Sequence, residues 1–201
     1  MSAIPTPSEP RGASRATRWA IALLLAAIVP VTAFAQTTVT TLSGGPSSLN
    51  PTSASGTNDG NTATVAQFNT PGGLALEPSG GVLWLADILN STVRRLDLNS
   101  GLTTTLATNS SGGNFIFSTP VDVAVDGNTN LYILTAGDGR IFQVDLRNLA
   151  FGAAITPITP AGTFTAPNAL AFDGIGNLYV VEEAGALRRV ALSNFTVSAS
   201  L

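Results

Sequence analysis

The sequence contains no cysteine, no histidine and no lysine, and only 10% of its residues are charged. Without cysteine the chain has no disulfide bonds, so packing alone must hold the fold together. The lack of both cysteine and histidine also removes the usual zinc ligands and the histidine of serine-type catalytic triads. These absences exclude disulfide-stapled folds, ordinary zinc sites and histidine-dependent catalysis within this chain.

Long apolar runs are also scarce, and the one strong run lies near the N terminus. Residues 19–35 carry no charge, follow three arginines and end in Ala-Phe-Ala. This pattern predicts a secretory signal peptide over residues 1–35, cleaved before Gln36. The alternative is a retained membrane anchor, but the strongly apolar core contains Pro30 and is shorter than the ~20 residues that span a bilayer. The expected location is therefore secreted or periplasmic, with no membrane association after cleavage.

Negative charge dominates the chain that would remain after cleavage. Residues 36–201 contain six arginines and eleven acidic residues, a net charge of −5. Nucleic-acid-binding surfaces are usually basic, so we expect no nucleic-acid partner.

What the chain does contain is a repeat. A Phe-x-x-Pro motif starts at Phe68, again at Phe117 and again at Phe164. Each copy is followed by an apolar stretch, a turn, a second apolar run with an aromatic residue, a strand with arginine in or beside it, and a closing stretch of small or threonine-rich residues. The three units cover residues 68–108, 117–160 and 164–201.

Four short strands per unit at this period predict an all-β fold of β-propeller blades, each with four antiparallel strands. The middle strands are continuous apolar runs, as expected for strands that are buried on both faces. A threonine-rich stretch at 37–42 reads as the outer strand of another blade, and we assign residues 36–67 to this closing strand and its linker. The prediction is about three blades plus one extra outer strand, which is an incomplete ring.

A closed propeller needs roughly four to eight blades, so the number of units leaves two interpretations open. In the first, the chain is part of a longer propeller protein. In the second, two chains associate into a six-bladed ring. Three blades alone would leave two apolar blade faces in water, larger than the few hundred Å² that monomers usually expose. We therefore expect self-association or aggregation through exposed blade faces.

The first unit contains a distinctive set of segments: FNTP at 68–71, LWLAD at 83–87, Asn90 and VRRLD at 93–97. With these segments it resembles the NHL-repeat β-propeller family, as a secreted bacterial member. The preceding NDGNTATVAQ at 58–67 is also similar to the linker of that family. The second and third units depart from the pattern, because Thr135 and Glu182 stand where the first unit has Asp87.

The resemblance implies a propeller that recognises a partner through its blade loops without catalysing a reaction. The partner itself is unknown and could be a protein, a glycan or a small ligand. The resemblance also implies an alternative function, because related propellers include calcium-dependent lactonases that use Glu, Asn and Asp around the central channel. The chain would then be a fragment of such an enzyme.

Five polar residues at turns are candidates for facing a ligand: Asp87, Asn90, Asp138, Glu182 and Glu183. The alternative for Asp87 is an Asx-type turn, in which the carboxylate accepts backbone N–H groups. Paired carboxylates such as Glu182 and Glu183 can transfer protons or bind a cation, but no nucleophile or metal set accompanies them. Simple solvated charge is the alternative for this pair, and no catalytic residue is assigned.

Calcium is the one cofactor considered, and its candidate ligands are Asp122, Asn168 and Asp173, near the expected innermost strands. These three do not form a convincing ligand set. The turn that starts at Asp126 has the alternating oxygen ligands of a calcium loop, but Leu131 stands where such a loop needs glycine. We therefore predict a tight turn there.

Arginine doublets at 94–95 and 188–189 occupy equivalent places in the first and third units. A doublet could bind an anionic ligand. Because the residues recur with the repeat, we predict a structural role instead, such as a salt bridge to Asp87 or Asp97.

Overall fold

The computed structural model describes residues 42, 55–61, 65–106, 115–127, 129–151 and 154–200. The chain divides into two units, Met1–Val39 and Thr40–Leu201, and every described residue belongs to the second. The expected signal peptide and, apart from Leu42, the expected outer strand at 37–42 lie outside the described residues. Within those ranges no helix is long and apolar enough to cross a membrane.

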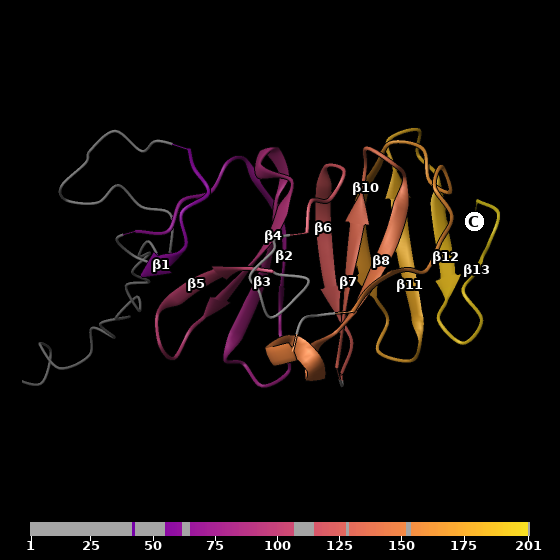
Figure 1. Ribbon diagram of the computed structural model, residues 1–201. Coiled ribbons are helices and arrows are strands. Elements are labelled where there is room, and N and C mark those ends of the chain that lie inside the picture. The colour runs from indigo at the N-terminus through magenta and orange to yellow at the C-terminus, as the bar shows by residue number, and fades with distance from the viewer. Residues whose placement is uncertain are drawn as a thin grey trace, which may run out of the picture. The chain divides into compact units, whose positions relative to one another are not determined.

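Three antiparallel sheets make up the described part of the chain (Figure 1), and in each of them four strands pair in sequence order. The prediction of an all-β fold with four-stranded antiparallel blades is confirmed. Two short 3₁₀ segments, η1 (Ile88–Asn90) and η2 (Leu146–Phe151), interrupt the strands. The first sheet contains β2 (Pro71–Leu76), β3 (Val82–Asp87), β4 (Thr92–Asp97) and β5 (Leu102–Thr105); the second contains β6 (Pro120–Val125), β7 (Asn130–Thr135), β8 (Arg140–Asp145) and β9 (Ile155–Pro157); the third contains β10 (Pro167–Phe172), β11 (Asn177–Glu182), β12 (Leu187–Ala191) and β13 (Thr196–Val197).

The first sheet has a fifth strand that the sequence did not predict. Strand β1 (Gly60–Asn61) pairs with the outer edge of β5, with Gly60 opposite Thr103. The residues around 58–61, which the sequence suggested as a linker, therefore extend the first sheet at its outer edge.

The second sheet lies between the other two and forms one hydrophobic core with each. Trp84, Ala86 and Val93 of the first sheet pack against Leu131 and Ile133 of the second. On its opposite face the second sheet contributes a further set of side chains, which pack against the third sheet. The residues of this second core include Tyr132, Leu134 and Ile141 on one side and Leu178, Val180 and Val190 on the other. The middle strands are therefore buried on both faces, which explains their continuous apolar runs.

The Phe-x-x-Pro motifs form strained turns at the start of the inner strands β2, β6 and β10. The residue before each proline has a positive φ, which is 53° at Thr70, 54° at Thr119 and 45° at Ala166. Non-glycine residues rarely adopt this region, and a residue before proline normally prefers an extended conformation. Such a backbone persists only where its surroundings hold it in place.

The inner strands also share a β-bulge directly after the proline. The register shifts between Pro71 and Leu74, between Pro120 and Asp122, and between Pro167 and Ala169. A bulge bends the strand and re-aims nearby side chains. It sets the positions of Asp122 and Asn168, two of the predicted calcium ligands.

Candidate functional site

Asp87 is a fully buried carboxylate at the end of β3, and its oxygens are occupied by the protein itself. Oδ1 accepts the Asn69 N–H at 2.7 Å, within the strained Phe-x-x-Pro turn. Oδ2 accepts hydrogen bonds from Asn90 Nδ2 at 2.8 Å and from Arg94 at 2.9 Å, and Arg94 is also fully buried. Asp87 is one of the two partners predicted for the arginine doublet, and its salt bridge to Arg94 lies within a single sheet. Asp87 and Asn90 thus hold the turn together.

The segment before the first Phe-x-x-Pro motif completes this network. Arg94 donates to the Asn58 carbonyl at 2.8 Å and pairs with Asp59 Oδ1 at 2.8 Å. Asn90 Nδ2 donates to the Gly56 carbonyl at 2.7 Å. Asp59 also accepts the backbone N–H of Thr105 at 2.9 Å, beside the β1–β5 pairing. The buried cation therefore lies between two carboxylates and fixes residues 56–59 against the first sheet.

The phenylalanine of each motif faces the same position of the third strand in its own sheet. The Arg94 guanidinium carbon lies 5.0 Å from the Phe68 ring centroid, and the Arg188 guanidinium carbon lies 5.8 Å from that of Phe164. In the second sheet Phe142 takes this position and meets Phe117 edge to face at 5.5 Å. Cation–π and aromatic contacts thus substitute for each other at one place in the repeat. This exchange indicates a packing role for the first arginine of each doublet, which is Arg94 in β4 and Arg188 in β12.

Glu182 repeats the role of Asp87 in the third sheet. Its Oε1 accepts the Thr165 N–H at 2.6 Å, and the residue is buried. Its neighbour Glu183 is exposed. The structure therefore separates the paired carboxylates suggested by the sequence, because one faces the turn and the other faces solvent.

The second sheet has a hydroxyl at this position, and it contacts the turn between β7 and β8 instead of the Phe-x-x-Pro turn. Thr135, buried at the position of Asp87, donates to Asp138 and lies 3.1 Å from the Arg140 carbonyl. Asp138 also forms an ion pair with Arg140 at 2.8 Å. Of the predicted loop residues, Asp87, Asn90, Asp138 and Glu182 are all engaged in turns, and Glu183 alone projects its charge into solvent.

Asp122 lies at the bulge of the middle inner strand and links adjacent sheets. Its Oδ1 accepts the Val123 N–H at 2.8 Å, and its Oδ2 accepts the Leu170 N–H of the third sheet at 2.7 Å. A Cβ atom added to Gly73 of the first sheet would lie 1.6 Å from Asp122 Oδ1. Burial raises the pKa of Asp122, and the two backbone hydrogen bonds oppose that rise only in part. The carboxylate therefore contacts all three inner strands.

Asp173 belongs to a turn at the other end of the inner strand β10. Its Oδ1 accepts the N–H groups of Ile175, Gly176 and Asn177, and its Oδ2 accepts Asn177 Nδ2 at 2.6 Å. Desolvation raises the pKa of Asp173, but these hydrogen bonds outweigh it and bring the pKa down to about 2. Asp126 closes the corresponding turn of the second sheet by accepting the Thr129 and Asn130 N–H groups, as predicted for a tight turn.

The three candidate calcium ligands do not lie at one place in the structure. Asp122 and Asn168 follow the prolines that start their strands, whereas Asp173 comes five residues after Asn168, about 15 Å away along an extended strand. Both oxygens of Asp122 already accept backbone N–H groups. In the described part of the chain no three acidic side chains are placed together so that they could hold a metal.

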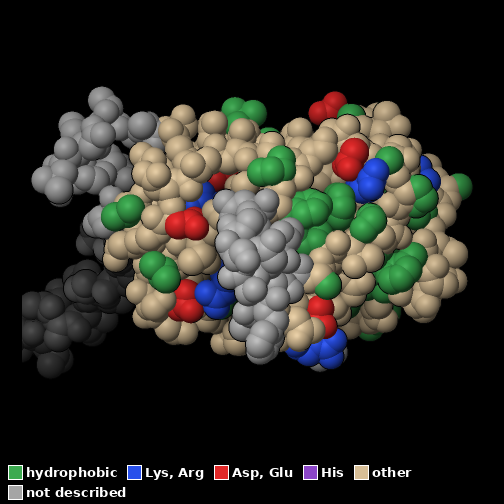
Figure 2. Space-filling view, viewed as in Figure 1, with side chains coloured by type: hydrophobic (Ala, Val, Ile, Leu, Met, Phe, Trp, Pro, Cys, Tyr) green, Lys and Arg blue, Asp and Glu red, His purple; other side chains and the backbone are tan. Residues whose placement is uncertain are grey.

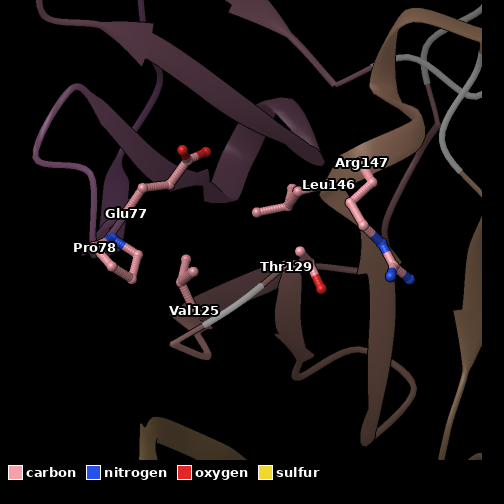
Figure 3. Close-up of a pocket in the computed structure, with 6 residues that line it drawn as sticks. All are labelled: Glu77, Pro78, Val125, Thr129, Leu146 and Arg147. Carbon is pink, nitrogen blue, oxygen red and sulfur yellow. The ribbon is translucent and has the colours of Figure 1, made fainter.

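A groove between the first two sheets, which the sequence did not reveal, is lined by charged, polar and apolar side chains. Its volume is about 210 Å³, and it lies between the β2–β3 turn of the first sheet and the β6–β7 turn and η2 of the second. In Figure 3 the Leu146 side chain points into the space between Glu77 and Thr129. The lining residues are Glu77, Pro78, Val125, Thr129, Leu146 and Arg147.

The groove carries opposite charges on an apolar floor. Glu77 Oε1 accepts the indole N–H of the buried Trp84 at 2.8 Å, which fixes the carboxylate. Arg147 is held by two hydrogen bonds to Asp145, at 2.9 and 2.8 Å. The Arg147 hydrogen bonds lower the pKa of Asp145 to about 2. All three units have an acidic residue at the Glu77 position and a leucine at the Leu146 position. The repeat therefore explains these residues, and the packing of two sheets creates the groove.

No protein-family profile matches the sequence, and no curated protein matches it. Solved structures do match in fold, and they are propeller-like proteins. The three sheets are therefore propeller blades, and we refer to them as blades one, two and three. The narrower resemblance to NHL repeats stays a prediction.

Three of the similar structures illustrate the fold. Two come from Bacteroides thetaiotaomicron VPI-5482, a structural genomics protein of unknown function and an auxiliary nutrient binding protein. They are 20% and 16% identical to the chain, and both have a TM-score of 0.61, with 79% of this chain and 36% of theirs covered. A gluconolactonase from Xanthomonas campestris has 16% identity and a TM-score of 0.52, with 67% of this chain and 48% of its own covered. The chain thus spans about a third to a half of the length of these proteins.

Proposed function

We propose that the chain is an exported, non-catalytic binding module of the β-propeller class, which takes a small hydroxyl-rich ligand in the groove between blades one and two. The observation that carries this proposal is the groove itself, where a carboxylate and a guanidinium flank apolar side chains. Ligand sites are typically concave and apolar, with a few fixed polar groups. Export rests on the signal peptide predicted from residues 1–35.

The polar groups of the groove suit hydroxyl groups. A carboxylate has about four acceptor positions, and the Trp84 indole uses one of those of Glu77. Thr129 supplies a hydroxyl that both donates and accepts, and Arg147 is a donor at the rim. Pro78, Val125 and Leu146 would contact the apolar face of a sugar-like ring. A nutrient-binding protein among the similar folds agrees with this class of function.

The engaged state of the candidate acids supports binding over catalysis. A general acid or base must reach the reacting group, and a nucleophile must be activated by a nearby base. Asp87, Glu182 and Asp122 instead accept backbone or arginine hydrogen bonds that hold turns and blades together. The alternative is that the chain is a fragment of a calcium-dependent lactonase-like enzyme. Such an enzyme needs its calcium ligands at one place, and Asp122, Asn168 and Asp173 do not lie together.

Saturation-transfer difference NMR on the full chain with a panel of neutral mono- and disaccharides tests the proposal. We expect transfer to at least one sugar, and we expect Leu146→Trp to abolish it by filling the groove. Glu183→Gln, which removes an exposed carboxylate elsewhere, is the matched control and should leave the signal unchanged. Absence of transfer for every sugar, or transfer that Leu146→Trp does not reduce, would contradict the proposed site.

A further inference from the structure

Blade three presents to solvent a face that blades one and two bury against their neighbours. The strand registers define the equivalent positions, because Trp84, Tyr132 and Tyr179 each pair with the same position of the next strand. The aligned positions are Trp84, Ala86 and Val93 in blade one, Tyr132, Leu134 and Ile141 in blade two, and Tyr179, Val181 and Leu187 in blade three.

Exposure separates the third set from the first two. Ala86, Val93, Leu134 and Ile141 are fully buried. Val181 is 44% exposed and Leu187 is 38% exposed. We call the surface formed by Tyr179, Val181 and Leu187 the leading face of blade three. Figure 2, which has the orientation of Figure 1, shows hydrophobic side chains at the surface over the third sheet, with acidic and basic groups beside them.

Blade one exposes its other face, which corresponds to the face that blades two and three pack against the preceding blade. Leu74 occupies the place of Val123 in blade two and Leu170 in blade three, as their pairing with the second strand shows. Val123 and Leu170 are buried against the preceding blade, whereas Leu74 is 61% exposed. Leu76, two residues further along β2, is 53% exposed. We call the surface formed by Leu74 and Leu76 the trailing face of blade one.

We propose that the leading face of blade three docks onto the trailing face of blade one in a second copy of this chain. The molecule already forms this type of contact twice, between blades one and two and between blades two and three. Both halves of a third such contact are exposed on the same chain. The contact is heterologous, so it joins copies head to tail and produces a closed ring or a longer assembly.

The internal precedent identifies the occupant. A leading face meets a trailing face in both covered interfaces, so neither two leading faces nor two trailing faces reproduce the packing. The apolar side chains that would be covered are those that the repeat conserves as apolar in all three blades. In blade two their counterparts Leu134, Ile141 and Val123 are covered almost completely.

Sedimentation velocity of the full chain over a range of concentrations tests this proposal. We expect a mass above that of the monomer that rises with concentration. A leading-face variant, Val181→Glu with Leu187→Glu, and a trailing-face variant, Leu74→Glu, should each weaken association at least tenfold. Ile175→Glu is the matched control, since Ile175 is 88% exposed in a turn outside both faces. Far-UV circular dichroism checks that each variant is folded.

An equimolar mixture of the two face variants distinguishes head-to-tail docking from other association. Each variant keeps one intact face, so the mixture should form a one-to-one complex although each variant alone is monomeric. Every variant carries the same N-terminal apolar run, so association through that run would persist in all of them. A monomeric wild type at all concentrations, an associating leading-face variant or a mixture without a complex would each overturn the proposal. None of these results depends on sugar binding in the groove.

Discussion

The Arg94 guanidinium donates to Asp87 Oδ2 at 2.9 Å, and both side chains are completely buried. This pair joins the end of β3, the middle of β4 and residues 56–59, because Arg94 also reaches Asn58 and Asp59. It thereby supports the strained turn at Thr70 on which the inner strand of blade one depends. The residues that most resembled a site in the sequence therefore stabilise a blade.

Removal of one partner from this pair should be severely destabilising. Arg94→Ala leaves Asp87 buried without its cation, a change that typically costs about 3–5 kcal/mol of unfolding free energy. Arg188→Ala is the control, because Arg188 contacts Phe164 and backbone carbonyls and has no buried carboxylate partner among the described residues. Its loss should be about 1 kcal/mol. Urea unfolding followed by circular dichroism measures both, and equal losses would contradict the special role of Arg94.

Adjacent glutamates in blade three should behave differently. Glu182→Ala removes the acceptor of the Thr165 N–H and should lower the unfolding free energy by about 1–3 kcal/mol. Glu183→Ala, at an exposed position, should change it by no more than about 0.5 kcal/mol. If thermal denaturation gives the larger loss for Glu183→Ala, the assignment of Glu182 to the turn is wrong.

Gly73→Ala should destabilise the contact between blades one and two. The added Cβ would lie 1.6 Å from Asp122 Oδ1 and 2.9 Å from Asp122 Cα, so the inner strands would have to move apart. Because the closest atom belongs to the Asp122 side chain, Asp122→Ala should relieve part of the strain, and the two losses should not add. Additive losses in a double-mutant cycle of urea unfolding would show that Gly73 and Asp122 do not meet. Gly80→Ala provides a comparison in which nothing surrounds the added carbon, although its φ of 73° adds backbone strain.

Stability should decrease in acid through the turn carboxylates. The pKa of Asp173 falls from 3.8 to about 2 on folding, so its contribution is present above pH 3.8 and is lost as pH falls through about 2. Asp145, whose pKa is also lowered to about 2, acts in the same direction. The double variant Asp173→Asn with Asp145→Asn should therefore show a flatter fall in urea midpoint between these pH values. An unchanged dependence of the urea midpoint on pH would mean that the two turns do not stabilise the ionised forms of Asp173 and Asp145.

The sequence predicted the architecture well, since it depends on features that repeat. The Phe-x-x-Pro motifs, the apolar middle strands and the turn residues all recur, and each has a local cause in backbone geometry or burial. The Asp87–Arg94 salt bridge was also predictable, because the doublet recurs near an acidic strand end. In contrast, burial of Glu182 beside an exposed Glu183 depends on the direction of each side chain at the end of β11.

Features that depend on long-range packing could not be predicted from the sequence. Asp59 lies 35 residues before Arg94, and only the fold brings their charges together. The groove arises where Glu77 of blade one approaches Leu146 and Arg147 of blade two. Single-unit patterns carry no information on such contacts, whereas the Asp59–Gly60 sequence could have been a signal for an ordered segment.

The central claim is that the polar residues shared by the units serve the blade, so sequences should be exchangeable between blades. Blade two has Thr135 and Phe142 where blade one has Asp87 and Arg94. The most direct measurement is the unfolding free energy of Asp87→Thr/Arg94→Phe. Replacing a buried ion pair by residues that pack avoids the uncompensated buried charge that Arg94→Ala leaves behind. The double variant still loses the hydrogen bonds of Arg94 to residues 58 and 59 and that of Asp87 to the Asn69 N–H. The account predicts a loss clearly smaller than the about 3–5 kcal/mol expected for Arg94→Ala. A loss as large as that of Arg94→Ala would contradict it.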